Sequence, residues 1–367
     1  MTPLETLIRE RIRRNGPMPV SDYMALALSH PEHGYYRKAD PLGARGDFIT
    51  APEIGQMFGE LIGLWCAVTW RQAGCPAPFA LVELGPGRGT LMADALRAAR
   101  AVPEFGKAVA LHLVETGPAL RAKQAETLRD RAPSWHETLD EVPPGPAIVV
   151  ANEFFDALPV DQYVRTPDGW RLRCVAFDDA SGALAFAADP DRAAPDGLVP
   201  SGPMDVPAGA IFEVCPTGTE IAGAIARRIA ADGIAALIAD YGHARRGAGE
   251  TLQAVRRHRR HDVLADPGEA DLTAHVDFAA LAAAAGSAGA RPWGPVPQGA
   301  FLSALGIEER TARLVAHAGK KQSALLREGC RRLIAADGMG TLFKVVALTR
   351  KSAAAPAGFE SQTAGVG

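Results

Sequence analysis

The sequence predicts an α/β protein built on a mostly parallel, doubly wound β-sheet. From residue 79 onward, short apolar runs alternate with amphipathic stretches of helical period, the pattern of parallel βαβ units. The first run leads directly into a glycine-rich turn, and the runs at 79–84, 109–114 and 147–151 are each followed by polar or acidic residues. Sites in such sheets lie at the carboxyl ends of the strands, so we expect the functional residues there.

An all-helical segment precedes the first strand. Helical periodicity marks residues 3–14, 21–29 and 53–72. The third stretch begins behind Pro52, a residue suited to a first helical turn. We therefore expect residues 1–75 to form a helical segment that also carries a loop able to cover a ligand.

The remaining chain predicts one α/β domain over residues 76–350 with an insertion. Residues 160–213 contain short apolar runs separated by Pro-Asp-Gly and Asp-Ala-Ser-Gly turn signals, which indicates inserted antiparallel hairpins. The polar, Ala- and Gly-rich residues 351–367 are predicted to be a disordered tail. Further strands are expected at 234–239 and 342–348, and further helices near 277–286 and 308–335.

Composition excludes some classes of protein. With 39 Lys and Arg against 42 Asp and Glu, the net charge is −3, which gives no bias toward polyanions. The basic run at 256–261 is isolated, so we interpret it as a solvated loop or a contact with an acidic partner, and no nucleic acid is expected.

The cysteines and the apolar segments indicate a reducing compartment. The five cysteines are odd in number and lack zinc spacing, so we expect reduced thiols. There is no secretory signal pattern, and no run approaches the roughly 18 apolar residues of a membrane span. We expect a cytoplasmic protein, although the amphipathic, Arg-containing N-terminus leaves an organellar destination open.

The strongest local motif follows the first strand: Glu83, Gly85, Gly87 and Gly89 stand at alternate positions before a helix. Glycines let a backbone approach a ligand closely, and a helix N-terminus offers unpaired N–H groups. The dinucleotide fingerprint requires Gly or Ala where Thr90 stands. The acidic-x-G-x-G-x-G spacing instead resembles the first motif of class I methyltransferases, in which the acid lies near a cationic amine. A merely tight strand-to-helix turn is the alternative.

Glu115 ends the second strand, before Gly117-Pro118 opens the next helix. A carboxylate at this position can accept both hydroxyls of a ribose diol. Adenosylmethionine and NAD both contain that diol, so Glu115 does not separate them. A solvated acid at the strand end is the other interpretation.

Three polar residues follow the strand at 147–151: Asn152, Glu153 and Asp156. Two carboxylates suit a cationic acceptor such as guanidinium, which they can hold bidentately and orient for attack. They can also take the proton after transfer. Capping of a following helix by Asn152 or Asp156 is the alternative.

The loop over residues 46–54 contains more polar and aromatic groups than a connection needs. Thr50 and Glu53 are therefore candidate contacts to the donor in a lid that excludes water. A plain N-cap before Pro52 is the alternative. His258 and His261 could ligate a metal, but methyl transfer requires none, so we predict no metal site.

The motifs together resemble the MidA-like family of methyltransferases, to which the mitochondrial complex I assembly factor methyltransferase belongs. The resemblance covers about residues 5–350 and rests on Gly-Asp-Phe-Ile-Thr-Ala-Pro-Glu (46–53), Glu-Leu-Gly-Pro-Gly-Arg-Gly-Thr-Leu (83–91), Ala-Asn-Glu-Phe-Phe-Asp-Ala-Leu-Pro-Val (151–160), Asp-Tyr-Gly (240–242), His-Asp-Val-Leu (261–264) and Pro-Gly-Glu-Ala-Asp-Leu-Thr-Ala-His-Val-Asp-Phe (267–278).

The resemblance implies a class I, Rossmann-like methyltransferase fold with a seven-stranded sheet and S-adenosyl-L-methionine as cofactor. It implies symmetric dimethylation of arginine on the quinone-site subunit of NADH dehydrogenase, in the cytoplasm for a bacterial-type chain and in the mitochondrial matrix for eukaryotic relatives. Gly85, Gly87 and Glu115 carry over as donor contacts, and the 46–53 loop would cover the donor. A homodimer is left open.

Three alternatives remain at this stage. The first is a non-catalytic complex I assembly chaperone that keeps a donor pocket for stability. The second is a methyltransferase acting on a small molecule or RNA. The third is a dinucleotide oxidoreductase, which Glu83 and Thr90 disfavour.

Overall fold

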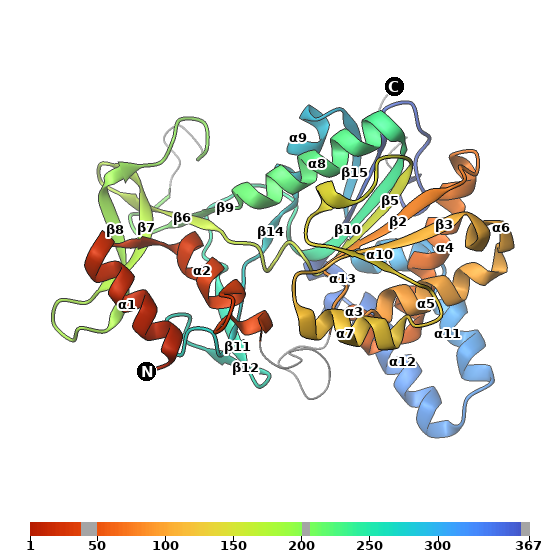
Figure 1. Cartoon of the computed structure of the whole chain (residues 1–367), viewed down its shortest axis with the longest axis horizontal. Coiled ribbons are helices and arrows are strands. Elements are labelled where there is room, and N and C mark those ends of the chain that lie inside the picture. The colour runs from red at the N-terminus through yellow and green to blue at the C-terminus, as the bar shows by residue number, and fades with distance from the viewer. Residues whose placement is uncertain (38–49, 200–205, 361–367) are drawn as a thin grey trace. The chain divides into compact units, whose positions relative to one another are not determined.

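The structure is a computed structural model that describes residues 1–37, 50–199 and 206–360 (Figure 1). The chain divides into two compact units, described separately below. The first contains Met1–Phe48, Asp156–Gly218 and Arg245–Asp277, and the second contains Ile49–Phe155, Thr219–Ala244 and Phe278–Gly367.

The second unit is built on a mixed, mostly parallel sheet. Seven of its strands lie in the order β15-β16-β10-β5-β2-β3-β4. The strands from β10 to β4 run parallel, whereas β16 is antiparallel to both β10 and β15. This confirms the predicted fold class. The strands are β2 (Phe79–Leu84), β3 (Val109–Val114), β4 (Ser134–His136), β5 (Ala147–Asn152), β10 (Ile234–His243), β15 (Ala290–Pro297) and β16 (Phe343–Arg350).

Helices cover this sheet. In Figure 1, α8 and α9 lie along one side of it and α5, α7 and α12 along the other. The helices are α3 (Ala51–Ile54), α4 (Gln56–Gln72), α5 (Thr90–Ala98), α6 (Pro103–Ala108), α7 (Pro118–Thr127), α8 (Pro216–Asp232), α9 (Phe278–Ser287), α10 (Gln298–Ala304), α11 (Ile307–Ala316), α12 (Lys320–Ile334) and α13 (Met339–Leu342).

Two helices that the sequence predicts as continuous are interrupted. The stretch at 53–72 forms α3 and α4 because Gly55 is extended, with φ 177° and ψ 150°. The stretch at 308–335 forms α11 and α12, with a break at residues 317–319. On both sides of each break, the buried faces of the two helices pack against the same hydrophobic core.

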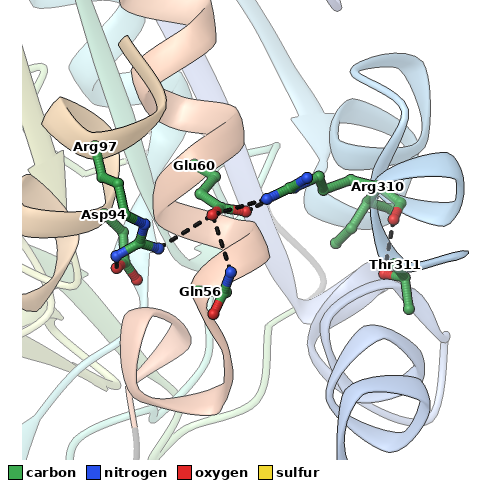
Figure 2. A network of polar contacts seen from close by, with 7 residues as sticks. Gln56, Glu60, Asp94, Arg97, Arg310 and Thr311 are labelled. Atoms are coloured by element: carbon green, nitrogen blue, oxygen red, sulfur yellow. Dashed lines mark hydrogen bonds and ion pairs between the residues drawn. The ribbon is translucent and has the colours of Figure 1, made fainter. Parts of the chain in front are cut away.

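A network of ion pairs around the buried Glu60 ties α4 to α5 and α11 (Figure 2). Glu60 is 3% exposed and accepts hydrogen bonds from Arg310 at 2.8 and 3.0 Å and from Arg97 at 3.1 Å. Burial raises the pKa of the Glu60 carboxyl, but the hydrogen bonds from the two arginines outweigh it, so the net pKa lies below its usual range. Glu60 is therefore ionised in the folded chain at neutral pH.

Residues 351–360 pack onto the second unit. Phe359 is fully buried against the Phe301 ring, and the Trp65 indole N–H donates to the Ala357 carbonyl at 3.1 Å. The sequence predicts a disordered tail from residue 351, because its polar, Ala- and Gly-rich composition gives no sign of this packing. Residues 361–367 lie outside the described part of the chain.

The first unit combines the N-terminal helices α1 (Pro3–Asn15) and α2 (Val20–Ser29) with antiparallel strands. One sheet has the order β1-β7-β6-β9, with β8 paired to β7, which confirms the inserted hairpins. Another sheet has the order β12-β11-β13. The strands are β1 (Met18–Pro19), β6 (Asp161–Thr166), β7 (Gly169–Phe177), β8 (Leu184–Ala193), β9 (Ile211–Val214), β11 (Gln253–Arg256), β12 (Arg259–His261) and β13 (Asp271–Thr273).

The basic run at 256–261 forms the β11–β12 hairpin of the first unit. Arg256 pairs with Asp266 at 2.8 Å, and the His261 ring lies 3.4 Å from the same carboxylate. The side chains from 257 to 260 at the tip are exposed. Throughout the described residues, no helix combines the length and the apolar character needed to cross a membrane.

Candidate functional site

The glycine-rich turn joins β2 to α5 in the conformation that the motif requires. Gly85, Gly87 and Gly89 have φ values of 61°, 53° and 81°, the left-handed region that favours glycine. A Cβ at Gly85 would lie 2.8 Å from a ring carbon of Phe154, so the turn also has no room for a side chain there. Gly89, the N-cap residue of α5, has no side chain that could cap this helix, and the first N–H groups of such a helix can bind a ligand.

Glu83 lies on β2, two residues before this turn, and is 3% exposed. Within the described residues its Oε2 has no hydrogen-bond partner. Burial raises the pKa of this carboxyl to about 8. A buried carboxyl without a partner is costly, and a cationic group placed beside it would relieve that cost.

Glu115 follows β3 at the same edge of the sheet. Its Oε1 accepts the Gly117 backbone N–H at 2.7 Å, and its Oε2 lies 3.3 Å from the Gln124 amide nitrogen. Burial is the largest influence on the Glu115 carboxyl and leaves its pKa above the usual range despite these hydrogen bonds. The carboxylate is thus fixed in orientation at the end of the strand neighbouring β2.

Gln124 is a residue that the sequence analysis did not single out. It lies in α7, has no exposed surface, and donates to the Gly87 carbonyl at 2.8 Å. Its amide oxygen accepts the Trp135 indole N–H at 2.8 Å. One side chain therefore connects the glycine turn with Glu115.

The end of β5 brings together several polar groups of the second unit. Glu153 has a φ of 49°, an unusual value for a residue with a side chain and a sign of local strain. Its Oε1 accepts the Ala51 backbone N–H at 2.7 Å, so it caps α3. The buried Asn152 Oδ1 has no partner within the described residues.

Asp240 on β10 is a second residue that the sequence analysis did not assign to the site. It is fully buried and accepts the backbone N–H groups of Phe154 at 3.1 Å, Phe155 at 2.9 Å and Tyr241 at 2.9 Å. These bonds hold the turn after β5, and with it the backbone of Glu153, in a single conformation.

Comparison with known proteins decides the family. Residues 61–296 match the family model described as "Putative S-adenosyl-L-methionine-dependent methyltransferase". The chain belongs to this family of S-adenosylmethionine-dependent methyltransferases. The predicted enzyme class and cofactor are thereby confirmed, and the alternative of a dinucleotide oxidoreductase is wrong.

Curated relatives of this methyltransferase are similar over most of their length. The mouse protein named "Protein arginine methyltransferase NDUFAF7, mitochondrial" is 39% identical, over 95% of this chain and 84% of the relative. The human protein of that name is 37% identical, over 95% and 83%. The Drosophila melanogaster homologue is 37% identical, over 93% and 83%.

A solved structure supports the same family assignment. The crystal structure of a Burkholderia thailandensis protein bound to S-adenosyl-homocysteine superposes with a TM-score of 0.83 at 31% identity, covering 97% of this chain and 94% of that one. The charge of such a donor fits the turn of the methyltransferase, because the donor carries a cationic amine and, among the residues that the structure describes, Oε2 of the buried Glu83 has no hydrogen-bond partner.

The candidate lid of the methyltransferase is described only in part. Residues 46–49 lie outside the described residues. Thr50 is the N-cap residue of α3, although its side chain makes no capping bond. Glu53 accepts the Thr90 hydroxyl at 2.7 Å, and its other oxygen lies 3.9 Å from the Arg88 guanidinium. Glu53 therefore ties α3 to the glycine turn.

Asp156 belongs to the first unit of the methyltransferase, whereas Asn152 and Glu153 belong to the second. Asp156 is 7% exposed, and its backbone carbonyl accepts the Ala274 N–H at 2.9 Å. Within that unit, Asp156 and Asp271 both raise the pKa of the Tyr36 hydroxyl after burial, its largest cause. Among the described residues no group of His, Cys, Asp and Glu side chains could hold a metal ion, and all five cysteines are free.

Proposed function

We propose that this methyltransferase is a protein arginine N-methyltransferase that forms symmetric dimethylarginine on the quinone-site subunit of NADH dehydrogenase. The observation that carries the proposal is the similarity, at 37–39% identity over more than nine tenths of the chain, to relatives named protein arginine methyltransferase. A cytoplasmic location and a homodimer stay predictions.

The donor would be held at the carboxyl edge of β2 and β3. Glu83 would lie near its cationic amine, the backbone of Gly85, Gly87 and Gly89 would line it, and Glu115 would accept its ribose hydroxyls. Thr50 and Glu53 would contact it from α3, whose tie to the glycine turn supports this role. Bound there, S-adenosylmethionine supplies a methyl group activated by a sulfonium.

The acceptor would be oriented by Asn152, Glu153 and Asp156. A guanidinium matches carboxylates in both charge and planar geometry. As the new nitrogen–carbon bond forms and the carbon–sulfur bond breaks, with its electron pair left on sulfur, the attacking nitrogen must lose one proton. Glu153 is suited to take it, because Asp240 fixes the turn behind it. Arginine is a weak acid, so orientation and exclusion of water would contribute most of the rate.

Transfer of a labelled methyl group tests this function. The purified chain, labelled S-adenosylmethionine and the purified quinone-site subunit should yield label in protein, and mass spectrometry should locate symmetric dimethylarginine. Glu153→Gln and Asp156→Asn should each lower the transfer rate about 100-fold or more while donor affinity stays unchanged. The exposed acids Glu104 and Asp130 provide matched controls, and Glu104→Gln and Asp130→Asn should transfer normally.

Each possible result has a clear meaning. Label recovered in RNA or a small molecule would contradict the protein acceptor. Donor binding without transfer to the subunit would favour the assembly chaperone. Normal transfer by both Glu153→Gln and Asp156→Asn would refute the assignment of these residues to the acceptor site, but not the proposed function.

A further inference from the structure

Gln124 connects the two parts of the proposed donor site, although it lies in neither the glycine-rich turn nor the end of β3. Its side chain lies on α7 and is completely buried. Its neighbours are the Gly87 carbonyl at 2.8 Å, the Glu115 carboxylate at 3.3 Å and the Trp135 indole nitrogen at 2.8 Å. All of these residues lie in the second unit.

The chemistry of these neighbours fixes the orientation of the amide. An indole N–H can only donate, so the amide oxygen of Gln124 must face Trp135. The amide nitrogen then faces two acceptors, the Gly87 carbonyl and a Glu115 oxygen, and has one hydrogen for each. Rotating the amide by half a turn would place oxygen against two acceptors and leave the indole N–H unpaired.

From this geometry we infer that Gln124 is a positioning residue for the methyl donor. It holds the Gly87 backbone and the Glu115 carboxylate at a fixed separation. The inference rests on the proposed role of Glu115 and the glycine turn in donor binding. Because Gln124 acts through these groups, it should influence donor affinity and leave the rate of transfer at saturating donor unchanged.

Two substitutions distinguish the effect of the Gln124 hydrogen bonds from the effect of its side-chain volume. Gln124→Met keeps a similar length and removes all three hydrogen bonds. Gln124→Glu can still accept from Trp135 but places a carboxylate against the Gly87 carbonyl and Glu115. Two charged or titratable residues contact the Glu115 backbone: Arg121 donates to its carbonyl at 2.6 Å, and the His136 carbonyl accepts its N–H at 3.0 Å. The His136 ring itself lies 2.9 Å from the His112 ring.

The chain offers a matched control in Gln298. This glutamine on α10 is also completely buried and also donates to a backbone carbonyl, that of Leu333, at 3.0 Å. Gln298→Met removes a comparable hydrogen bond without touching the glycine turn. A purely structural role for Gln124 predicts that both glutamines behave alike.

The experiment is calorimetric titration of each full-length variant with S-adenosylhomocysteine, followed by steady-state kinetics with the protein acceptor. At pH 8 we expect Gln124→Met and Gln124→Glu to weaken binding about tenfold, since hydrogen bonds to a carboxylate and to the turn are lost. The KM for the donor should rise similarly with kcat unchanged. Gln298→Met should bind within about twofold of the original chain.

A pH series adds a readout that simple destabilisation would not move. As pH falls from 8 to 6, the new carboxyl in Gln124→Glu can take up a proton and donate again, so its affinity should approach that of the original chain. Gln124→Met should show no such recovery. If Gln124→Glu does not fold, Gln124→Met and Gln298→Met still decide the question.

The outcomes distinguish a failure of the positioning role of Gln124 from a failure of the proposed donor site. Unchanged affinity in both Gln124 variants, or equal weakening in Gln298→Met, would overturn the positioning role. Absence of binding by the unsubstituted chain would instead refute the proposed donor site itself.

Discussion

At the residue scale, the sequence pattern found the groups whose role depends on their immediate neighbours. Glu83, Glu115 and the three glycines each end or follow a strand, and the structure places them at one sheet edge. Gln124 was not singled out, and Asp240 was noted only as part of the Asp-Tyr-Gly motif without a role, because the partners of both residues are remote in the sequence. Gln124 bonds Gly87 across 37 positions, and Asp240 bonds Phe155 across 85. No local spacing encodes such contacts.

Glu83 leads to a prediction about protons. Its pKa of about 8 means that the carboxyl is mostly neutral at pH 7 in the unliganded chain. A cationic amine beside it favours the ionised form, so donor binding should release about one proton. Calorimetry with S-adenosylhomocysteine at pH 7, in buffers of different ionisation enthalpy, measures this number. The dependence on buffer should vanish in Glu83→Gln, and a dependence that persists there would exclude Glu83 as the source.

The same carboxyl has a signature in stability. Because its folded pKa lies above its unfolded value of 4.5, the stabilisation it contributes is complete below pH 4.5 and is lost as pH rises through about 8. The free energy of unfolding of Glu83→Gln, relative to the original chain, should therefore rise across that window. A difference that is flat with pH would contradict the burial of a neutral carboxyl.

At the element scale, periodicity located helices and strands but not their interruptions. The extended Gly55 ends α3 and begins α4, whereas Glu153 caps the opposite end of α3, at Ala51. Strand β15 was missed because Pro292 and Pro295 lie within it, and prolines argue against a strand. The structure explains how these prolines are accommodated: β15 is an edge strand of the sheet, where missing N–H groups are tolerated.

The packing of α4 on α5 fixes the helix that follows the glycine turn. A Cβ at Gly63 would lie 2.2 Å from the Ala95 carbonyl oxygen, a backbone atom that cannot step aside. Gly63→Ala should therefore push the helices apart and destabilise the chain by about 1–3 kcal/mol or more. Chemical denaturation measures this loss. Gly106→Ala in α6 is the control, because its Cβ would meet nothing within 4 Å, and it should be neutral or slightly stabilising. Equal stability of the two variants would contradict the close approach.

At the scale of the whole molecule, the alternation of strands and helices was enough to predict the parallel sheet, because β2, β3, β5 and β10 each contain an apolar run. The strands β9, β11, β12 and β13 of the first unit were not predicted. They are short, and the burial of β11 and β13 depends on helices near the N-terminus: Ala254 of β11 and Leu272 of β13 pack in a core with Leu4 of α1. Such pairings between distant segments leave little trace in a local pattern.

The central claim is that the β2–α5 turn holds the methyl donor, and calorimetric titration with S-adenosylhomocysteine tests it most directly. The folded chain should bind one molecule of S-adenosylhomocysteine per chain. Gly85→Ala, which adds a methyl group 2.8 Å from Phe154 at a φ of 61°, should bind at least about tenfold more weakly while its circular dichroism is unchanged. A folded chain that gives no binding heat over a range of temperatures, or a Gly85→Ala variant that binds equally well, would contradict the claim.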